Sequence, residues 1–176
     1  MKLLALDLAT NVGFAIAEPR AVEAWPAGML LQGACGPVDG VRYGSHRIGS
    51  GGTEHGKFFS LYADWLTDLL TVEAPDTVVF EAPLPRIANA GIEAGRRALG
   101  LAATTDLIIY RRGIRAYELS VSTVRKTFCG NGRADKKEVM EACKRRGWNP
   151  PDLDTADALA LLDAAVHKLR LLRGGR

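Results

Sequence analysis

Four acidic residues occupy positions that suggest a chemical role for their carboxylates. Asp7 interrupts an apolar run, and Glu81 directly follows the apolar run Val78-Val79-Phe80. An ionised carboxylate in such surroundings is costly unless it is paired, hydrogen-bonded or bound to a metal. Asp154 and Asp157 are one helical turn apart, so they share one face of a predicted helix. The four carboxylates are therefore candidates for a single cleft.

An oxygen-only ligand set of this kind is typical of hard divalent cations. Mg²⁺ and Mn²⁺ prefer carboxylate ligands, and two such ions about 4 Å apart can activate water and stabilise the leaving oxygen in phosphodiester hydrolysis. Each position also has an ordinary explanation: Asp7 could pair with an arginine, Glu81 could face solvent, and the helical pair could complement a helix amino terminus. The combination of all four favours a two-metal nuclease site.

Apolar periodicity predicts the elements that must position these acids. Residues 3–8 and 13–17 predict a hairpin of two strands, and further strands are expected near 41–48, 77–80 and 115–119. Helices are expected over 54–73 and 91–111, from a capping box at Asp135 and Glu138 to Gly147, and from Asp152 or Asp154 towards Leu172. The order predicts an α/β fold, a mixed sheet flanked by helices, in one domain spanning residues 1–176.

The charge of the chain is uneven along its length. The formal net charge is +3, yet residues 111–146 contain eleven Lys or Arg against four acidic residues, a local excess of seven. Such a segment suits a polyanionic partner, because Lys and Arg displace counterions from phosphates. A solvated basic face without a partner explains the charge equally well.

The cysteines and the apolar runs indicate a cytoplasmic protein without membrane contact. Cys35, Cys129 and Cys143 are odd in number and lack C-x-x-C spacing, which argues against a disulfide framework or a zinc site. Asp7 interrupts the first apolar run before it reaches the length of a signal peptide's apolar region, and no later run approaches membrane length.

Four motifs occur in a fixed order along the chain: LALDLATNVGFA at 4–15, VFE at 79–81, VRKTFCGNGRADKKEV at 124–139 and DTADALA at 154–160. In order, spacing and residue type they resemble the RuvC Holliday-junction resolvases of the ribonuclease H-like superfamily. The resemblance covers the start of the chain and most of 77–167, but not 18–56. That short segment is more similar to phage-encoded relatives.

The resemblance implies a homodimeric crossover junction endodeoxyribonuclease that cuts opposed strands of a four-way DNA junction with two Mg²⁺ or Mn²⁺ ions per active site. It implies that Asp7, Glu81, Asp154 and Asp157 are the catalytic metal ligands. It places DNA contacts at Arg125 and Lys136, and the neighbouring Lys126, Arg133 and Lys137 extend this basic surface.

The chain departs from the pattern of this family in the residues that follow the second acid, Glu81. The family often carries an aromatic residue there that can stack at the junction, whereas this chain has Ala82, Pro83 and Leu84. Junction distortion and cleavage-sequence preference are therefore open. Phage-type relatives can cut flaps or other branches, so strict four-way specificity is open too.

Two other functions fit parts of the sequence. The segment 7–13 also resembles the first phosphate loop of actin-like kinases and ATPases, but that architecture needs two such domains around a nucleotide. A catalytically idle branched-DNA binder of the same fold is the second alternative. His46, His55 and His167 are expected to be structural or solvent-facing, and helical surfaces around 58–70 and 95–101 are candidates for dimer contact.

Overall fold

A mixed five-stranded sheet forms the centre of the protein. The computed structural model describes residues 1–25, 39–50, 52–83 and 91–174. The strands are β1 (Leu3–Asp7), β2 (Asn11–Ala17), β3 (Val41–Arg47), β4 (Thr77–Glu81) and β5 (Arg115–Leu119), and their order in the sheet is β3-β2-β1-β4-β5. β1 is antiparallel to β2 and parallel to β4, while β4 is parallel to β5. The predicted α/β class with a mixed sheet is confirmed.

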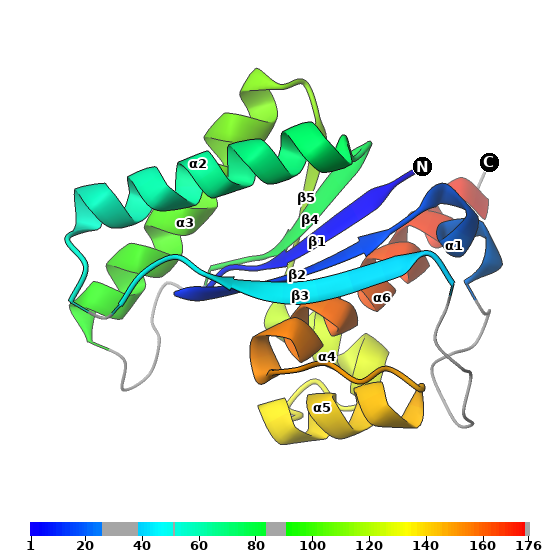
Figure 1. Cartoon of the computed structure of the whole chain (residues 1–176). Helices are drawn as coiled ribbons and strands as arrows, with labels where there is room; N and C mark the ends of the chain where they lie inside the picture. Colours follow the sequence, from blue (N-terminus) through cyan, green and yellow to red (C-terminus); the bar gives the residue numbers. More distant parts are fainter. Residues whose placement is uncertain (26–38, 51, 84–90, 175–176) are drawn as a thin grey trace.

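Helices cover both faces of this sheet (Figure 1). One face carries α2 (His55–Glu73) and α3 (Ile92–Arg111), and the other carries α1 (Pro19–Ala24), α4 (Val121–Cys129), α5 (Lys136–Arg145) and α6 (Leu153–Gly174). The side chains of β1 alternate between the two apolar cores that result, Leu3 and Ala5 facing one and Leu4 and Leu6 the other. No helix in the described part of the chain is both long and apolar enough to span a membrane.

The predicted helix over 54–73 is confirmed, but its aromatic stripe belongs to the core. Phe58, Tyr62 and Leu66 are fully buried against the sheet and α3. Close packing of the two helices depends on Gly100, where an added Cβ would lie 2.2 Å from the ring of Phe59. The side of the 58–70 helix that carries these buried residues is covered by the protein's own core, whereas Leu61, 42% exposed, lies on its outer side.

The last helix is confirmed as well, although its burial differs from the prediction. A single apolar side was expected, but every residue from 155 to 166 is buried. The reason is that α6 lies between the sheet and the pair α4–α5, so opposite faces of the helix both meet protein. Two short helices, α1 and α4, were not predicted from the sequence.

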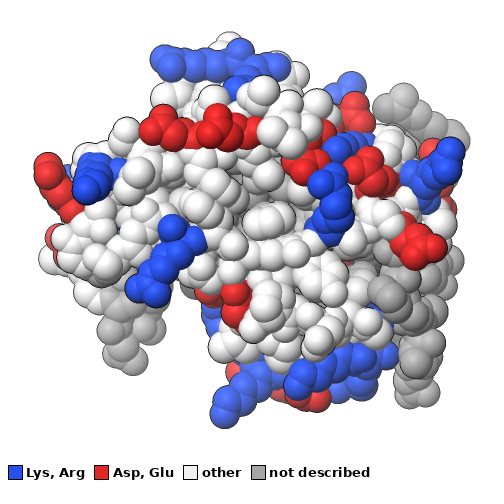
Figure 2. All heavy atoms as spheres, in the orientation of Figure 1, with Lys and Arg blue, Asp and Glu red and all other residues white. Residues whose placement is uncertain are grey.

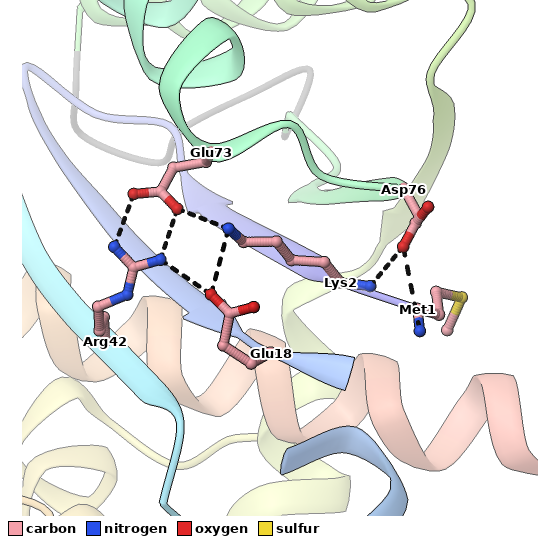
Figure 3. A network of polar contacts seen from close by, with 6 residues as sticks. All are labelled: Met1, Lys2, Glu18, Arg42, Glu73 and Asp76. Carbon is pink, nitrogen blue, oxygen red and sulfur yellow. Dashed lines mark hydrogen bonds and ion pairs between the residues drawn. The ribbon is translucent and has the colours of Figure 1, made fainter. Parts of the chain in front are cut away.

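A network of ion pairs fastens the amino-terminal end of β1, at the opposite end of the strand from Asp7 (Figure 3). The ammonium of Lys2 lies 3.1 Å from Glu18 and 2.9 Å from Glu73, and Arg42 pairs with the same two carboxylates. Hydrogen bonds from Arg42 and Lys2 outweigh partial burial and hold the pKa of Glu73 below its usual value. The network joins β1, β3, α2 and the start of α1.

Candidate active site

Strand ends and one helix start bring the predicted acids into one region. Asp7 ends β1 and Glu81 ends β4, and because these strands are parallel neighbours, both residues emerge at the same edge of the sheet. The first turns of α6, which carry Asp154 and Asp157, pack against β1 and β2. The four acids share one electrostatic environment, since Asp157, Glu81 and Asp154 all act on Asp7.

Burial and mutual repulsion make Asp7 and Glu81 reluctant to ionise. Burial, followed by the charges of Asp157 and Glu81, raises the pKa of Asp7 well above its usual value. Burial and the charge of Asp157 raise the pKa of Glu81 to about 7. Oδ2 of Asp7 is buried and has no hydrogen-bond partner among the described residues. Such a group gains most from a cation placed beside it.

Lys136 provides a positive charge at this site. Its ammonium lies 2.9 Å from Oδ1 of Asp154 and 3.1 Å from Oδ2 of Asp157. Burial would lower the pKa of Lys136, but the hydrogen bond to Asp154 and the charges of Asp157 and Asp7 outweigh it and raise the pKa. The capping box of α5 fixes the start of the helix that carries this lysine, because Asp135 accepts from the backbone of Lys137 and Glu138.

The antiparallel strands β2 and β3 position the start of α6. Nδ2 of Asn11 donates to Oδ2 of Asp154 at 2.9 Å. Ser45 Oγ donates to Asp152, whose other oxygen accepts from the backbone of Thr155 and thereby caps the helix. At Gly13 an added Cβ would lie 2.0 Å from the carbonyl oxygen of Asp154, so α6 rests directly on the backbone of β2.

A cleft of about 380 Å³ opens over three of the four acids, and Asp154 is not among its lining residues. Its polar lining combines three carboxylates with two cationic side chains: Asp7, Glu81, Asp157, Arg125 and Lys136. The remaining lining residues are small or apolar, among them Ala82 and Pro83, which follow the second acid where an aromatic residue was noted as missing. Leu84 lies outside the described residues.

The residues at this cleft fit divalent cations in chemistry. They supply only carboxylate oxygens, one of them buried without a partner, and the Lys136 ammonium already lies where a cation is favoured. As the side chains stand, no three Asp, Glu, His or Cys residues in the described part of the chain are close enough to hold one ion. Metal binding here therefore requires side-chain movement, including displacement of Lys136.

The predicted basic residues divide into two groups. Arg125 on α4 and Lys136 on α5 line the cleft, whereas the exposed Lys126, Arg133 and Lys137 lie outside its lining. Figure 2 shows Lys and Arg side chains gathered along the lower edge of the molecule, where α5 lies in Figure 1. The basic residues thus lie on or between the same helices, α4 and α5, that contribute Arg125 and Lys136 to the acidic cleft.

The histidines take no part in this cleft. His46 stacks on Trp65, His55 pairs with Glu93, and His167 lies 3.8 Å from the buried Asp163. Sequence analysis missed Asn11 and Gly13, which hold the start of α6. The available signal was a polar residue and a glycine two positions apart, at the point where the strand after Asp7 begins.

Comparisons with known proteins agree with this arrangement. No family model matches the chain. The crossover junction endodeoxyribonuclease RuvC of Anaeromyxobacter sp. (strain K) is 36% identical over 100 residues, which is 56% of this chain and 49% of that protein, so the match spans about half the relative's length.

Solved structures match over nearly the whole chain. RuvC of Thermus thermophilus in complex with a Holliday junction substrate has a TM-score of 0.71 at 16% identity, covering 97% of this chain and 96% of that one. The yeast mitochondrial Holliday junction resolvase Ydc2 has a TM-score of 0.63 at 16% identity, covering 98% of this chain and 80% of that one. At this level of identity the likeness establishes a shared fold.

Proposed function

We propose that this chain, which is RuvC-like in sequence and in fold, is a metal-dependent endonuclease that cleaves branched DNA and resolves four-way junctions by paired nicks. The observation that carries the proposal is the cleft in which Asp7, Glu81 and Asp157 face Arg125 and Lys136. Buried acids that repel one another need a cation, and cationic side chains beside them suit a phosphate.

The four acids have one shared role in this proposal. Asp7, Glu81, Asp154 and Asp157 would hold two Mg²⁺ or Mn²⁺ ions, which activate water and stabilise the leaving oxygen when bound. Asp7 and Glu81 come from rigid strand ends, and the other two come from a helix packed on the sheet. This rigidity limits the reorganisation needed when DNA arrives.

The cations of the cleft would orient the scissile phosphate. Arg125 acts on the Glu81 carboxylate through its charge, which places its guanidinium near the acids. Lys136 would leave its carboxylate partners when divalent ions enter, and its ammonium would then be available to a phosphate oxygen. The exposed Lys126, Arg133 and Lys137 would bind flanking phosphates and so determine affinity more than rate.

A homodimer would supply two such clefts for two opposed strands. An exposed apolar stripe runs along α3, formed by Ile92, Leu99, Leu107 and Tyr110, which are 90, 50, 49 and 85% exposed. Their spacing puts them on one face of the helix. Contact of this face with the same face of a second copy would give the isologous interface that a two-fold dimer requires. This stripe lies on α3, the helix that contains the candidate region 95–101, and it is more exposed and more apolar than the outer side of the 58–70 helix.

The test compares cleavage of a mobile four-way junction, a flap, a fork and a linear duplex by the full chain in Mg²⁺ or Mn²⁺. We expect symmetric nicks in the four-way junction, little cutting of linear duplex, and none in EDTA. Preferred cutting of a flap or fork would support the proposed nuclease activity but would assign it a different substrate. If the chain binds the four-way junction tightly but cuts none of these substrates, the proposed nuclease activity is rejected.

Asp7→Asn provides the matched control, because it removes one charge while nearly preserving side-chain volume. We expect junction binding and thermal stability to be retained and cleavage to fall at least about 100-fold, since the variant weakens the cation site alone. Wild-type cleavage by this variant would exclude Asp7 from the chemistry.

The idle branched-DNA binder keeps one observation in its favour, namely that Lys136 already neutralises Asp154 and Asp157. In such a protein the ammonium would replace the metal permanently. Mn²⁺ binding by the DNA-free or DNA-bound chain separates the two functions, because the idle binder would not take up the ion at this site.

A further inference from the structure

Asp154 is held from two sides. Asn11 Nδ2 donates to its Oδ2 at 2.9 Å, and Lys136 Nζ donates to its Oδ1, also at 2.9 Å. One oxygen is therefore fixed by β2 and the other by α5. With both oxygens engaged, the carboxylate has little freedom to rotate.

These two donors differ in what can replace them. The Lys136 ammonium lies between Asp154 and Asp157, so it occupies a position that favours positive charge, and a divalent ion can take that place. The Asn11 amide is neutral; it donates to the opposite oxygen of Asp154 and also hydrogen-bonds the Asp152 carboxylate. Its hydrogen bond can persist when the ammonium leaves.

We propose that Asn11 is a positioning residue that aims Oδ1 of Asp154 at the cation position between Asp154 and Asp157. This inference rests on the metal-dependent function proposed above. Asn11 does not touch the reacting atoms; it acts through the carboxylate that it orients.

The local packing gives Asn11 a fixed relation to Asp154. Asn11 and Gly13 are two residues apart on β2, so they face the same side of the sheet. α6 rests on the backbone of Gly13, where an added Cβ would lie 2.0 Å from the Asp154 carbonyl oxygen. Ser45, opposite Gly13 in the strand register, holds Asp152 at the start of the same helix. The distance from Asn11 to Asp154 is thus set by the sheet itself.

Loss of such an outer hydrogen bond typically weakens metal binding by about 10–100-fold, because the ligand must be oriented anew for each ion bound. Asn11→Ala removes the donor and keeps every carboxylate. We therefore expect its Mn²⁺ affinity to fall about tenfold or more. The Mn²⁺ concentration that gives half-maximal cleavage should rise by a similar factor, while cleavage at saturating Mn²⁺ recovers towards wild type and DNA affinity in EDTA is unchanged.

The experiment measures free Mn²⁺ by electron paramagnetic resonance during titration of the full chain, with thermal melting as the check on folding. Asn149→Ala is the matched control, since Asn149 is an exposed asparagine shortly before α6. Asn11→Ser is a second variant, which keeps a polar residue at the start of β2 but is too short to reach Asp154. We expect it to bind Mn²⁺ as weakly as Asn11→Ala, and the control to bind like wild type.

The outcomes separate this inference from the proposed function. Wild-type chain that binds Mn²⁺ and cleaves DNA, together with a folded Asn11 variant of unchanged Mn²⁺ affinity, would overturn the positioning role alone. A cleavage defect that saturating Mn²⁺ does not relieve would also overturn it. Wild-type chain that neither binds Mn²⁺ nor cuts any branched DNA would overturn the proposed function, and this inference with it.

Discussion

Glu81 illustrates how burial and charge act on a single residue of the site. Its carboxylate is partly shielded from water at the end of β4, and Asp157 adds repulsion, so its pKa rises to about 7. Arg125 and Lys136 oppose this shift without cancelling it. At neutral pH, the metal-free protein therefore holds Glu81 close to the midpoint of its titration, ready to lose its proton to an arriving cation.

The same shift predicts a pH dependence of stability. Between about pH 4.5 and 7 the folded state retains the Glu81 proton that the unfolded chain has lost, so the contribution of Glu81 to the free energy of unfolding decreases as pH rises through this window. Glu81→Gln should remove this contribution and stabilise the metal-free protein at pH 8 by up to about 3 kcal/mol. Urea unfolding at pH 5 and pH 8 in EDTA measures both effects. Equal pH dependence in the two proteins would show that Glu81 ionises normally.

At the scale of elements, the contact between β2 and α6 determines where two of the four acids lie. Asp7 and Gly13 are paired in the strand register, and the start of α6 lies over Gly13. A glycine at this position lets a helix backbone approach a strand backbone more closely than any side chain would allow. The acids of β1 and α6 are neighbours for this reason.

Gly13→Ala should therefore impair both stability and chemistry. The added Cβ meets backbone atoms, which cannot rotate away, so α6 must shift. We expect a loss of about 1–3 kcal/mol in the free energy of unfolding and a strong loss of cleavage, with junction binding retained. Denaturant unfolding and cleavage rates check this outcome. Gly95→Ala is the control, because a Cβ there meets nothing within 4 Å and should be neutral or slightly stabilising.

The helices α4 and α5 carry the proposed phosphate contacts. If Arg125 and Lys126 each contact one phosphate, replacing either with Ala should reduce the slope of log affinity against log salt by roughly one unit. Junction binding measured from low to moderate salt gives this slope. Lys144→Ala is the control, because the ammonium of Lys144 on α5 already forms an ion pair with Oε1 of Glu141 at 2.9 Å. Slopes identical to wild type in both variants would remove these residues from the DNA surface.

The variant Lys136→Ala tests something different from the Arg125 and Lys126 variants. Its ammonium pairs with Asp154 and Asp157, so its replacement changes the acidic site as well as the basic surface. A salt slope for Lys136→Ala therefore mixes two effects. Arg125 and Lys126 form no ion pair within the described residues, although the charge of Arg125 acts on Glu81 and Asp157.

At the scale of the whole molecule, the proposed dimer depends on the apolar stripe of α3. Tyr110→Glu places a charge at the carboxy-terminal end of the stripe, on a surface that must lose water on association, so we expect the dimer to dissociate to monomers. Light scattering over a range of protein concentrations measures this change. Val72→Glu is the control, because Val72 on α2 is 79% exposed and lies outside the stripe. A wild-type chain that is monomeric both free and junction-bound would reject the homodimer.

Local sequence was sufficient for most elements. The β1–β2 hairpin, β5 and the capping box of α5 followed from alternation and from residues only a few positions apart, because the interactions that form them are themselves local. α1 and α4 escaped prediction because each is short. Ser120, the amino-terminal cap of α4, directly follows the predicted strand 115–119, and no helix was predicted after it.

The arrangement of the site required the tertiary structure. The acids were evident from sequence, because an Asp within an apolar strand and a D-x-x-D pair on a helix are local patterns. The partners of those acids were not: Asn11 and Asp154 are separated by 143 positions, and Lys136 reaches the acids from a separate helix. Such contacts depend on how distant segments pack, and residue type alone leaves many partners equally possible. Periodicity likewise placed α6, but only the layers on both of its sides decided that it is buried all round.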